Sequence, residues 1–373
     1  MAATEETEAR ELRVRRDALE TIEIVRIRNP AHPEDVELAE GEVVLAVDAF
    51  AFTANNVTYG LLGDAFHYWD FFPAPEGWGI VPVWGFGEVV RSRADGVAVG
   101  ERFYGYYPMA THVVLRPEQV GPSGFTDGAE HRRERAAVYN RYVSTAADPG
   151  YDPAHEAEQM LLRPLFATAF LLDDVLAETE RSGAAVVVLS SASSKTAYTT
   201  AFLLSRRGDA EVVGLTSARN VPFVERLGWY DHVLAYDDVE LLDPEVRTAY
   251  VDMSGDVVVR GALHRHLDDA LVADTMVGMT HKDALGGDPD LPGVTPTLFF
   301  APDRAARRLR DWGPAGLERR LAEAWTPYLA AVTDRTTGPL RVEHGRGPAE
   351  VERVYRAVLA GEAAPDAGHV LTL

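Results

Sequence analysis

The sequence contains no cysteine among its 373 residues. This absence excludes disulfide bonds, thiolate nucleophiles and every zinc site that depends on cysteine ligands. No apolar run approaches the roughly 18 residues of a membrane-spanning helix, and the acidic start MAATEETEAR lacks the apolar core of a signal peptide. We therefore expect a cytoplasmic protein that does not cross a membrane.

Positive charge is scarce as well. The chain has 36 Lys and Arg residues against 58 Asp and Glu residues, which gives a formal net charge of −22. Such an excess of carboxylates repels nucleic acids and anionic membranes, so we expect a small-molecule substrate and neither of those partners. An anionic ligand needs a local cationic pocket here. Lysine is the rarer cation, because only Lys195 and Lys282 occur.

The segment from Ala184 to Arg219 has the pattern of a strand, a helix and a second strand. A short apolar run ends at Leu189, a helical pattern covers Thr196 to Arg207, and Gly208 suits a left-handed helix cap. The same alternation continues along the chain without hairpin signals. This pattern predicts an α/β domain with a parallel, doubly wound sheet of the Rossmann type.

Glycine is missing from the loop after the first of these strands, which reads SSASSKT. The loop therefore lacks both the GxGxxG fingerprint and the Walker pattern. Small Ser and Ala residues still allow a phosphate to approach closely, and Ser hydroxyls can donate to its oxygens. The cofactor-binding candidates at this sheet edge are Ser190, Ser191, Ser193, Ser194, Lys195, Thr196, Thr216, Ser217, Arg219, Ser254, Gly278 and Lys282. Alternatively, both lysines are solvated residues of loops.

The N-terminal part has a different pattern of short strands between glycine and proline turns. The strands are expected at Ile22–Arg28, Glu42–Phe50, Val81–Val90 and Thr111–Leu115. Strands so short and closely spaced predict an antiparallel β barrel. The charged stretch from Glu130 to Val143 predicts a helix, and Ala157 to Glu178 predicts one or two helices around Pro164. We expect the C-terminal strands, Leu340–Glu343 and His369–Leu373, to complete the parallel sheet.

Aromatic residues gather in the stretch from Thr53 to Trp78, which reads TANNVTYGLLGDAFHYWDFFPAPEGW. One interpretation is plain hydrophobic core. The other is an aromatic-walled pocket into which Asn55, Asn56, Tyr59 and His67 project as polar groups.

Three segments carry a resemblance to a known superfamily. They read GEVVLAVDAFAFTANNV, GFGEVVRSRADGVAVGERFYG and ERLGWYDHVLAYDD. The chain resembles the medium-chain dehydrogenase/reductase superfamily, in particular its zinc-free quinone and enoyl reductases. The motifs YNRY, LLRPLFATAF, SSASSKTA and FFAP are similar to a branch known only as a domain of unknown function. The resemblance implies a GroES-like barrel over residues 1–160 as the substrate domain, with a helical insertion. A Rossmann domain over residues 161–310 and a returning segment over residues 311–373 follow.

The resemblance also implies a function. NAD-specific folds place an acidic residue after the second strand, whereas Thr216, Ser217 and Arg219 suit the 2′-phosphate of NADP. Zinc-dependent relatives use Cys or His where this chain has Thr53 and Asn56, so we expect no metal. The catalytic candidates, which would supply a hydrogen bond or proton during hydride transfer, are Tyr59, Asn56, His67, Tyr68 and His281.

We therefore expect an NADP-dependent, zinc-independent oxidoreductase that reduces an enone, an enoyl compound or a carbonyl compound. A homodimer is usual in similar proteins. Two alternatives remain open. The fold can serve a lyase or isomerase reaction without net redox chemistry, or it can bind a ligand or partner without catalysis.

Overall fold

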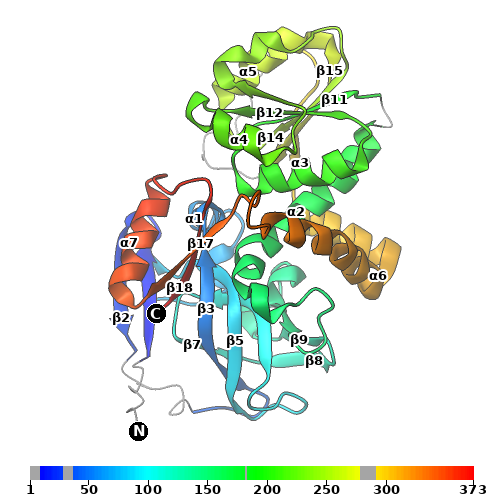
Figure 1. The fold of residues 1–373 in the computed structure, drawn as a ribbon. Coiled ribbons are helices and arrows are strands. Elements are labelled where there is room, and N and C mark those ends of the chain that lie inside the picture. Colours follow the sequence, from blue (N-terminus) through cyan, green and yellow to red (C-terminus); the bar gives the residue numbers. More distant parts are fainter. Residues whose placement is uncertain (1–8, 28–36, 181–182, 278–290) are drawn as a thin grey trace. The chain divides into compact units, whose positions relative to one another are not determined.

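The computed structural model describes residues 9–27, 37–180, 183–277 and 291–373 (Figure 1). These residues form two compact units. The first contains residues 1–161 together with 341–373, and the second contains residues 162–340. Each unit has its own sheets and its own core, and each is described separately below.

The second unit contains a six-stranded parallel sheet with the strand order β13-β12-β11-β14-β15-β16. Numbered from its first strand, this order is 3-2-1-4-5-6, which is the Rossmann arrangement. The sequence prediction of a parallel, doubly wound sheet is confirmed. The strands are β11 (Val186–Leu189), β12 (Glu211–Thr216), β13 (His232–Ala235), β14 (Thr248–Asp252), β15 (Leu271–Val277) and β16 (Thr297–Phe299).

Side chains alternate between the two faces of this sheet, and a separate hydrophobic cluster covers each face. Val187 and Leu189 pack with Leu172 and Leu204, which come from α2 (Glu156–Glu180) and α3 (Lys195–Arg207). On the other face, Val188 and its neighbours pack against α5 (Val257–Leu267) and η7 (Tyr236–Leu241). Both faces are therefore buried, which explains why the strands read as continuous apolar runs. The unit also contains the α-helices α4 (Val221–Leu227) and α6 (Ala301–Val332).

The first unit is built mainly from antiparallel strands. Nine strands form one sheet in the order β17-β18-β3-β5-β6-β10-β9-β8, with β7 paired to β3, and a second sheet has the order β2-β1-β4. The strands are β1 (Arg10–Arg15), β2 (Ala18–Arg26), β3 (Val43–Phe52), β4 (Trp78–Gly79), β5 (Pro82–Ser92), β6 (Arg102–Pro108), β7 (His112–Leu115), β8 (Pro117–Gly121), β9 (Gly124–Asp127), β10 (Arg141–Ser144), β17 (Arg341–Arg346) and β18 (Ala367–Thr372).

The C-terminal strands join this first unit, which corrects the expectation that they complete the parallel sheet. β17 pairs with β18 in parallel, and β18 pairs with β3 in the register His369 to Phe52. Helix α7 (Pro348–Leu359) contacts β17 and β2 (Figure 1). The sequence of a short alternating strand does not indicate which sheet the strand will join, because either sheet offers an edge for pairing.

The helix predicted from Glu130 to Val143 is also wrong. The segment forms two 3₁₀ turns, Glu130–Arg132 and Ala137–Asn140, followed by β10. Arg132 turns inward with 1% of its surface exposed, and its Nη1 lies 3.0 Å from Oδ2 of Asp127. Its Nη2 donates to the carbonyl oxygen of Tyr139 at 2.7 Å. The chain winds around this buried guanidinium because a buried cation must have its hydrogen bonds satisfied.

Candidate functional site

The loop between β11 and α3 lies at the carboxyl edge of the parallel sheet, where such sheets bind their ligands. Ser194 caps the helix, and its Oγ accepts a hydrogen bond of 3.3 Å from the amide of Ala197. Ser191 has a φ of 52°, in the left-handed region that favours glycine. A Cβ on Gly214 of β12 would lie only 2.9 Å from Cβ of Ala192. The loop can therefore pack this closely against β12 because the neighbouring strand has a glycine at this position.

Ser190 is fully buried and supports the loop from below. Its hydroxyl donates to Oδ1 of Asp252 at 3.0 Å and accepts from the amides of Met253 at 2.9 Å and Ser254 at 3.1 Å. The Ser254 hydroxyl likewise donates to Oδ1 of Asp252 at 2.8 Å. Ser190 and Ser254, both predicted to contact the cofactor, therefore use these hydrogen bonds to connect the ends of β11 and β14.

Asp252 is the centre of this network. Its Oδ2 accepts a hydrogen bond of 3.0 Å from Nε of Arg260, and the two side chains are 0% and 4% exposed. Burial alone raises the pKa of a carboxyl group. Here the charge of Arg260, together with hydrogen bonds from Ser254, Arg260 and the Gly255 amide, outweighs burial and lowers the pKa of Asp252. The carboxylate is therefore charged at neutral pH.

The end of β12 holds three more of the predicted ligands. Thr216 is buried, and its hydroxyl lies 3.5 Å from Oγ of Ser193, which also accepts from Nδ2 of Asn220 at 3.0 Å. Ser217 begins the 3₁₀ turn Ala218–Asn220. Arg219 in that turn is exposed, and within the described residues no ion pair or hydrogen bond involves its guanidinium.

Two arginines of α6 differ from Arg219 in this respect. Arg304 and Arg308 of α6 both bind Asp174 of α2, with Nε to Oδ2 distances of 2.5 and 2.7 Å. An unpaired cation at the carboxyl edge of the sheet is available for an anionic ligand, whereas the α6 arginines already have carboxylate partners.

The remaining cofactor candidates lie in two places. Lys195 and Thr196 are the first two residues of α3, and both are partly buried. Gly278 and Lys282 lie outside the described residues, as does the catalytic candidate His281.

Tyr236 is a residue of this edge that the sequence analysis missed. Its hydroxyl oxygen accepts a hydrogen bond of 3.0 Å from the amide of Ser191. Burial is the main cause that raises its pKa, and the charges of Asp252 and Asp256 add to this, so the phenol keeps its proton. Its place directly after β13, at the same edge as the loop, is the signal that could have identified it.

Two of the catalytic candidates in the first unit lie on α1 (Ala54–Leu61), and one of them has a structural role. Asn56 is 3% exposed; its Oδ1 accepts from the amide of Thr53 at 2.8 Å, and its Nδ2 donates to the carbonyl oxygen of Pro82 at 2.9 Å. Thr53 and Asn56 form a capping box at the start of the helix. These two residues, which the resemblance set against the zinc ligands of zinc-dependent proteins, thus begin this helix.

Tyr59, on the next turn of α1, is 6% exposed. Its oxygen accepts two hydrogen bonds, from Nδ2 of Asn55 at 2.8 Å and from Nε1 of Trp84 at 3.2 Å. Burial raises the pKa of Tyr59 strongly, and the neighbouring Tyr68 adds to the effect. The phenol is therefore neutral at physiological pH. Because both oxygen lone pairs are occupied, its own hydrogen is directed elsewhere.

The structure brings Tyr68 to Tyr59 but places His67 at the surface. The rings of Tyr59 and Tyr68 have centroids 4.7 Å apart, and the Tyr68 hydroxyl lies 3.2 Å from that of Tyr139. The His67 side chain is 58% exposed, and its Nδ1 lies 3.2 Å from Oδ2 of Asp70. Tyr139, which the sequence analysis did not select, comes from the second of the two 3₁₀ turns that replace the expected helix.

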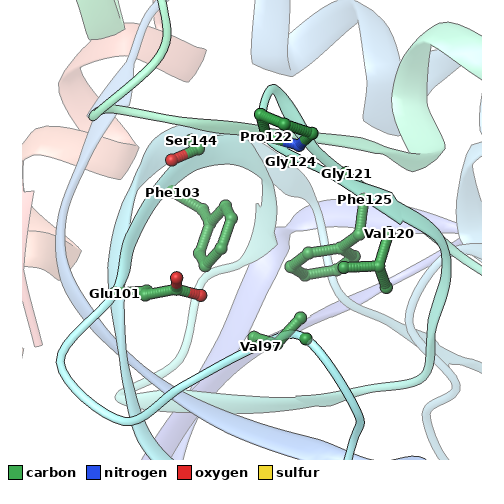
Figure 2. A pocket seen from close by; sticks show the side chains of 10 residues that line it. Val97, Glu101, Phe103, Val120, Gly121, Pro122, Gly124, Phe125 and Ser144 are labelled. Carbon is green, nitrogen blue, oxygen red and sulfur yellow. The ribbon is translucent and has the colours of Figure 1, made fainter.

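The first unit also contains a pocket of about 300 Å³, near β8 and β9 (Figure 2). Phe103, Phe125 and Val97 form apolar walls, and Glu101 lies at one side. The Glu101 carboxylate accepts a hydrogen bond of 3.0 Å from the amide of Ala98. The pocket contains none of the residues predicted for the site.

The described part of the chain contains no group of three or more His, Cys, Asp or Glu side chains that could hold a metal ion. Among the described residues, no helix combines the length and the apolar character needed to cross a bilayer.

Comparison with protein families matches residues 50–364 to a family described as "Protein of unknown function (DUF2855)". The chain belongs to the DUF2855 family. Comparison of this DUF2855 chain with curated protein sequences gives no match. Solved structures give clear matches at low identity.

CurA from Vibrio vulnificus, in complex with NADPH, is 13% identical with a TM-score of 0.62, and the match covers 97% of this chain and 98% of that one. The yhdH oxidoreductase from Salmonella enterica, in complex with NADP, is 14% identical with a TM-score of 0.53, covering 95% and 96%. The mitochondrial 2-enoyl thioester reductase heterodimer from Candida tropicalis is 11% identical with a TM-score of 0.54, and the match covers 98% of this chain and 100% of that one. These likenesses confirm the predicted medium-chain dehydrogenase/reductase fold.

Proposed function

We propose that this DUF2855 protein is an NADP-dependent, zinc-independent oxidoreductase that reduces an enone, an enoyl compound or a carbonyl compound. The observation that carries the proposal is Arg219, an exposed cation without a protein partner among the described residues, at the end of the second strand of a Rossmann sheet. That strand end is where the adenosine ribose of a dinucleotide binds, and a cation there suits a 2′-phosphate. The NADPH and NADP bound to the CurA and yhdH structures support the same cofactor.

The residues at the sheet edge fit a dinucleotide. Ser191, Ala192 and Ser193 are small enough for a pyrophosphate to approach the start of α3, whose first amides have no acceptor within the helix. The Ser193 oxygen accepts from Asn220 and Thr216, which leaves its own hydrogen to donate. Tyr236 accepts from the Ser191 amide, so its hydroxyl hydrogen is also available to a phosphate oxygen. Lys195, at the first position of α3, adds positive charge.

NADPH, when bound, supplies a hydride for the electrophilic carbon of the substrate. The chain must then stabilise the negative charge that develops on the carbonyl oxygen. We assign this role to Tyr59, because its oxygen is occupied by Asn55 and Trp84 and its hydrogen has no acceptor among the described residues. The hydrogen bonds orient the phenol, and its raised pKa keeps the proton in place until charge develops on the substrate.

The residues present support independence from zinc. The chain has no cysteine, and both ends of the Asn56 side-chain amide are occupied. Its oxygen accepts a hydrogen bond from the Thr53 amide, and its nitrogen donates one to the carbonyl oxygen of Pro82. Polarisation of the carbonyl is therefore assigned to hydrogen-bond donors of the protein. The homodimer and the cytoplasmic location remain predictions.

Titration of the protein with NADPH and with NADH, followed by the nicotinamide fluorescence, tests the proposal. We expect NADPH to bind more tightly. Arg219→Ala should weaken NADPH by about 5- to 150-fold, the loss of one charge-assisted contact worth roughly 1–3 kcal/mol, and should leave NADH unchanged. Arg226→Ala is the matched control, because Arg226 is an exposed arginine of nearby α4 that donates to the carbonyl oxygen of Pro222. Absence of affinity for both nucleotides would defeat the proposal.

A further inference from the structure

Four ionisable side chains of the second unit contact one another in its interior, and we call them the charge network: Asp252, Arg260, Asp274 and His264. Their side chains are 0%, 4%, 0% and 0% exposed. Arg260 and His264 lie one turn apart on α5, whereas Asp252 ends β14 and Asp274 lies within β15. Because so little solvent reaches them, these groups must compensate one another's charge.

Arg260 lies between the two carboxylates and is closer to one of them. Its Nε lies 3.0 Å from Oδ2 of Asp252 and 3.8 Å from Oδ2 of Asp274. Oδ1 of Asp274 is buried and has no hydrogen-bond partner among the described residues. A buried oxygen without a donor is costly, so a shift of Arg260 towards Asp274 would satisfy one carboxylate at the expense of the other. Arg260 therefore has two alternative partners.

The proton of His264 determines which partner Arg260 takes. Nε2 of His264 lies 2.8 Å from Oδ2 of Asp274, and its Nδ1 lies 2.8 Å from the carbonyl oxygen of Pro292. A neutral imidazole has one N–H group and cannot donate to both acceptors. With His264 protonated, two cations compensate two carboxylates. With His264 neutral, the two carboxylates share Arg260 alone, and no imidazolium opposes its attraction to Asp274.

The other ionisable groups around α5 do not replace this proton. Tyr250 of β14 pairs in register with Asp274, and burial raises the pKa of its phenol well above the usual range, so it stays neutral. The turns η7 and η8 (Asp268–Ala270) also contact α5, but their carboxylates are exposed. The exposed charged groups of these turns and of α5 itself are Asp237, Asp238, Glu240, Asp268, Asp269 and Arg265.

Asp252 connects the charge network to the edge of the sheet. Its Oδ1 accepts hydrogen bonds from the hydroxyls of Ser190 and Ser254, while its Oδ2 binds Arg260. If Arg260 shifts away, Oδ2 loses its cation and the carboxylate is no longer held in the orientation that both serines need. The excess negative charge also repels a phosphate at this edge.

We propose that His264 is a positioning residue for the cofactor site, which acts through Asp274 and Arg260 and makes dinucleotide affinity depend on its proton. This inference rests on the proposed NADP-dependent function, which it deepens by naming a regulation of the same site. Burial lowers the pKa of His264, but the bonds to Asp274 and Pro292 outweigh it and raise the pKa above 6.5. Affinity should therefore fall as the pH rises through that raised value.

Calorimetric titration with NADP at several pH values tests the inference. We expect the Kd of the unmodified protein to be about 3- to 10-fold higher at about pH 9 than at about pH 6, the effect of losing one neutral hydrogen bond. The 2′-phosphate of NADP has its own pKa near about 6. Its contribution is common to all variants, so only the part of the pH dependence that a substitution removes is assigned to the protein.

Two substitutions should act in opposite directions. His264→Gln removes the charge at every pH, so the Kd at low pH should rise to the value that the unmodified protein has at high pH. Asp274→Asn removes the competing carboxylate, so binding should stay tight at both. The double variant should also bind tightly at both pH values, because Arg260 then has only Asp252. A double variant that binds no better than His264→Gln overturns the inference, since simple loss of structure would add up.

His266→Gln is the matched control. His266 lies on the same helix, but its Nε2 faces the carbonyl oxygen of Leu242 at 2.7 Å and not a carboxylate. This variant should keep the full pH dependence of the unmodified protein. An equal pH dependence in His264→Gln and His266→Gln overturns the inference.

Failure of the NADP-dependent function gives a different result. If no dinucleotide binds, hydrogen exchange of the Met253 and Ser254 amides, which donate to the Ser190 hydroxyl, still tests the charge network. After correction for the intrinsic pH dependence of exchange, their protection in the unmodified protein should be about 3- to 10-fold lower at about pH 9 than at about pH 6. In the double variant it should not change with pH. Protection that is independent of pH in the unmodified protein overturns the inference.

Discussion

The hydroxyl of Ser190 lies 3.0 Å from Oδ1 of Asp252 and donates a hydrogen bond to it. This contact joins the ends of β11 and β14, while Oδ2 of the same carboxylate binds Arg260. The first residue of the glycine-free loop is therefore fixed by a buried ion pair. Rigid support of this kind positions the residues above it for a ligand.

Asp252→Asn should destabilise the second unit strongly. The substitution preserves the shape of the side chain but leaves buried Arg260 only the longer contact of 3.8 Å with Oδ2 of Asp274, at a cost of up to about 3–5 kcal/mol. Urea denaturation followed by circular dichroism measures this loss. Glu352→Gln is the control, because Glu352 forms an exposed pair with Arg356 and should cost at most about 1 kcal/mol. Equal effects of the two substitutions would contradict the role given to Asp252.

His264 links stability to pH. Its Nδ1 lies 2.8 Å from the carbonyl oxygen of Pro292, and its Nε2 lies 2.8 Å from Oδ2 of Asp274. Because both nitrogens face acceptors, these contacts favour the protonated ring, which carries a hydrogen on each nitrogen. Burial and the charge of Arg260 lower the pKa of His264, but the bonds to Asp274 and Pro292 outweigh them and raise it above 6.5.

The raised pKa sets the sign of the effect. The folded protein binds this proton more tightly than the unfolded chain, so the contribution is complete below pH 6.5 and is lost as the pH rises through the folded pKa. His264→Gln should remove this part of the pH dependence, measured as the difference in unfolding free energy between about pH 6 and about pH 9. His232→Gln, at a side chain that is 67% exposed, should retain it. An unchanged pH dependence in His264→Gln would rule out this linkage.

Ser191 should tolerate glycine better than any branched residue. Its φ of 52° is costly for a residue with a Cβ, by about 1–2 kcal/mol, whereas glycine adopts it freely but loses about 0.5–1 kcal/mol through backbone entropy. We expect Ser191→Gly to be up to about 1 kcal/mol more stable and Ser191→Val to be less stable than the natural protein. Thermal unfolding measures both. A stabilising Ser191→Val would mean that the loop backbone relaxes out of this conformation.

Tyr59→Phe should impair catalysis more than cofactor binding. Without the hydroxyl, the developing oxyanion loses a donor, and we expect kcat to fall by about 10²- to 10³-fold while the affinity for NADPH stays the same. The amide of Asn55 and the indole of Trp84 also lose their acceptor, so stability should decrease by about 1–3 kcal/mol. Tyr107→Phe separates the two effects, since it also removes a buried phenol hydrogen bond but should leave kcat unchanged. Comparable loss of kcat in both variants would argue against Tyr59 as the donor.

The parallel sheet was predictable because its strands are buried on both faces, so that Val186 to Leu189 reads as an uninterrupted apolar run. Local signals also identified the end of α3, where Gly208 has a φ of 69°. The segment from Glu130 to Val143 was not predictable in this way. Its charges suit an exposed helix, but the pairing of Arg132 with Asp127 depends on contacts that form only in the folded unit.

The site was predictable in outline and not in the role of each side chain. Strand ends located Ser190 and Ser254 correctly at the sheet edge, but their bonds to Asp252 involve residues about 60 positions apart or a turn that the pattern does not specify. Tyr236 and Tyr139 were missed because a tyrosine in a polar loop resembles many exposed tyrosines. Only the pairing of strands shows which residues meet.

The pairing of β18 with β3 means that the first unit is assembled from both ends of the chain. The second unit, residues 162–340, is synthesised entirely before Arg341 leaves the ribosome. During translation the parallel-sheet unit therefore has all of its residues first, while the first unit waits for residues 341–373. A stop codon placed between the codons for Leu340 and Arg341 would spare the second unit and leave the first unit without β17 and β18.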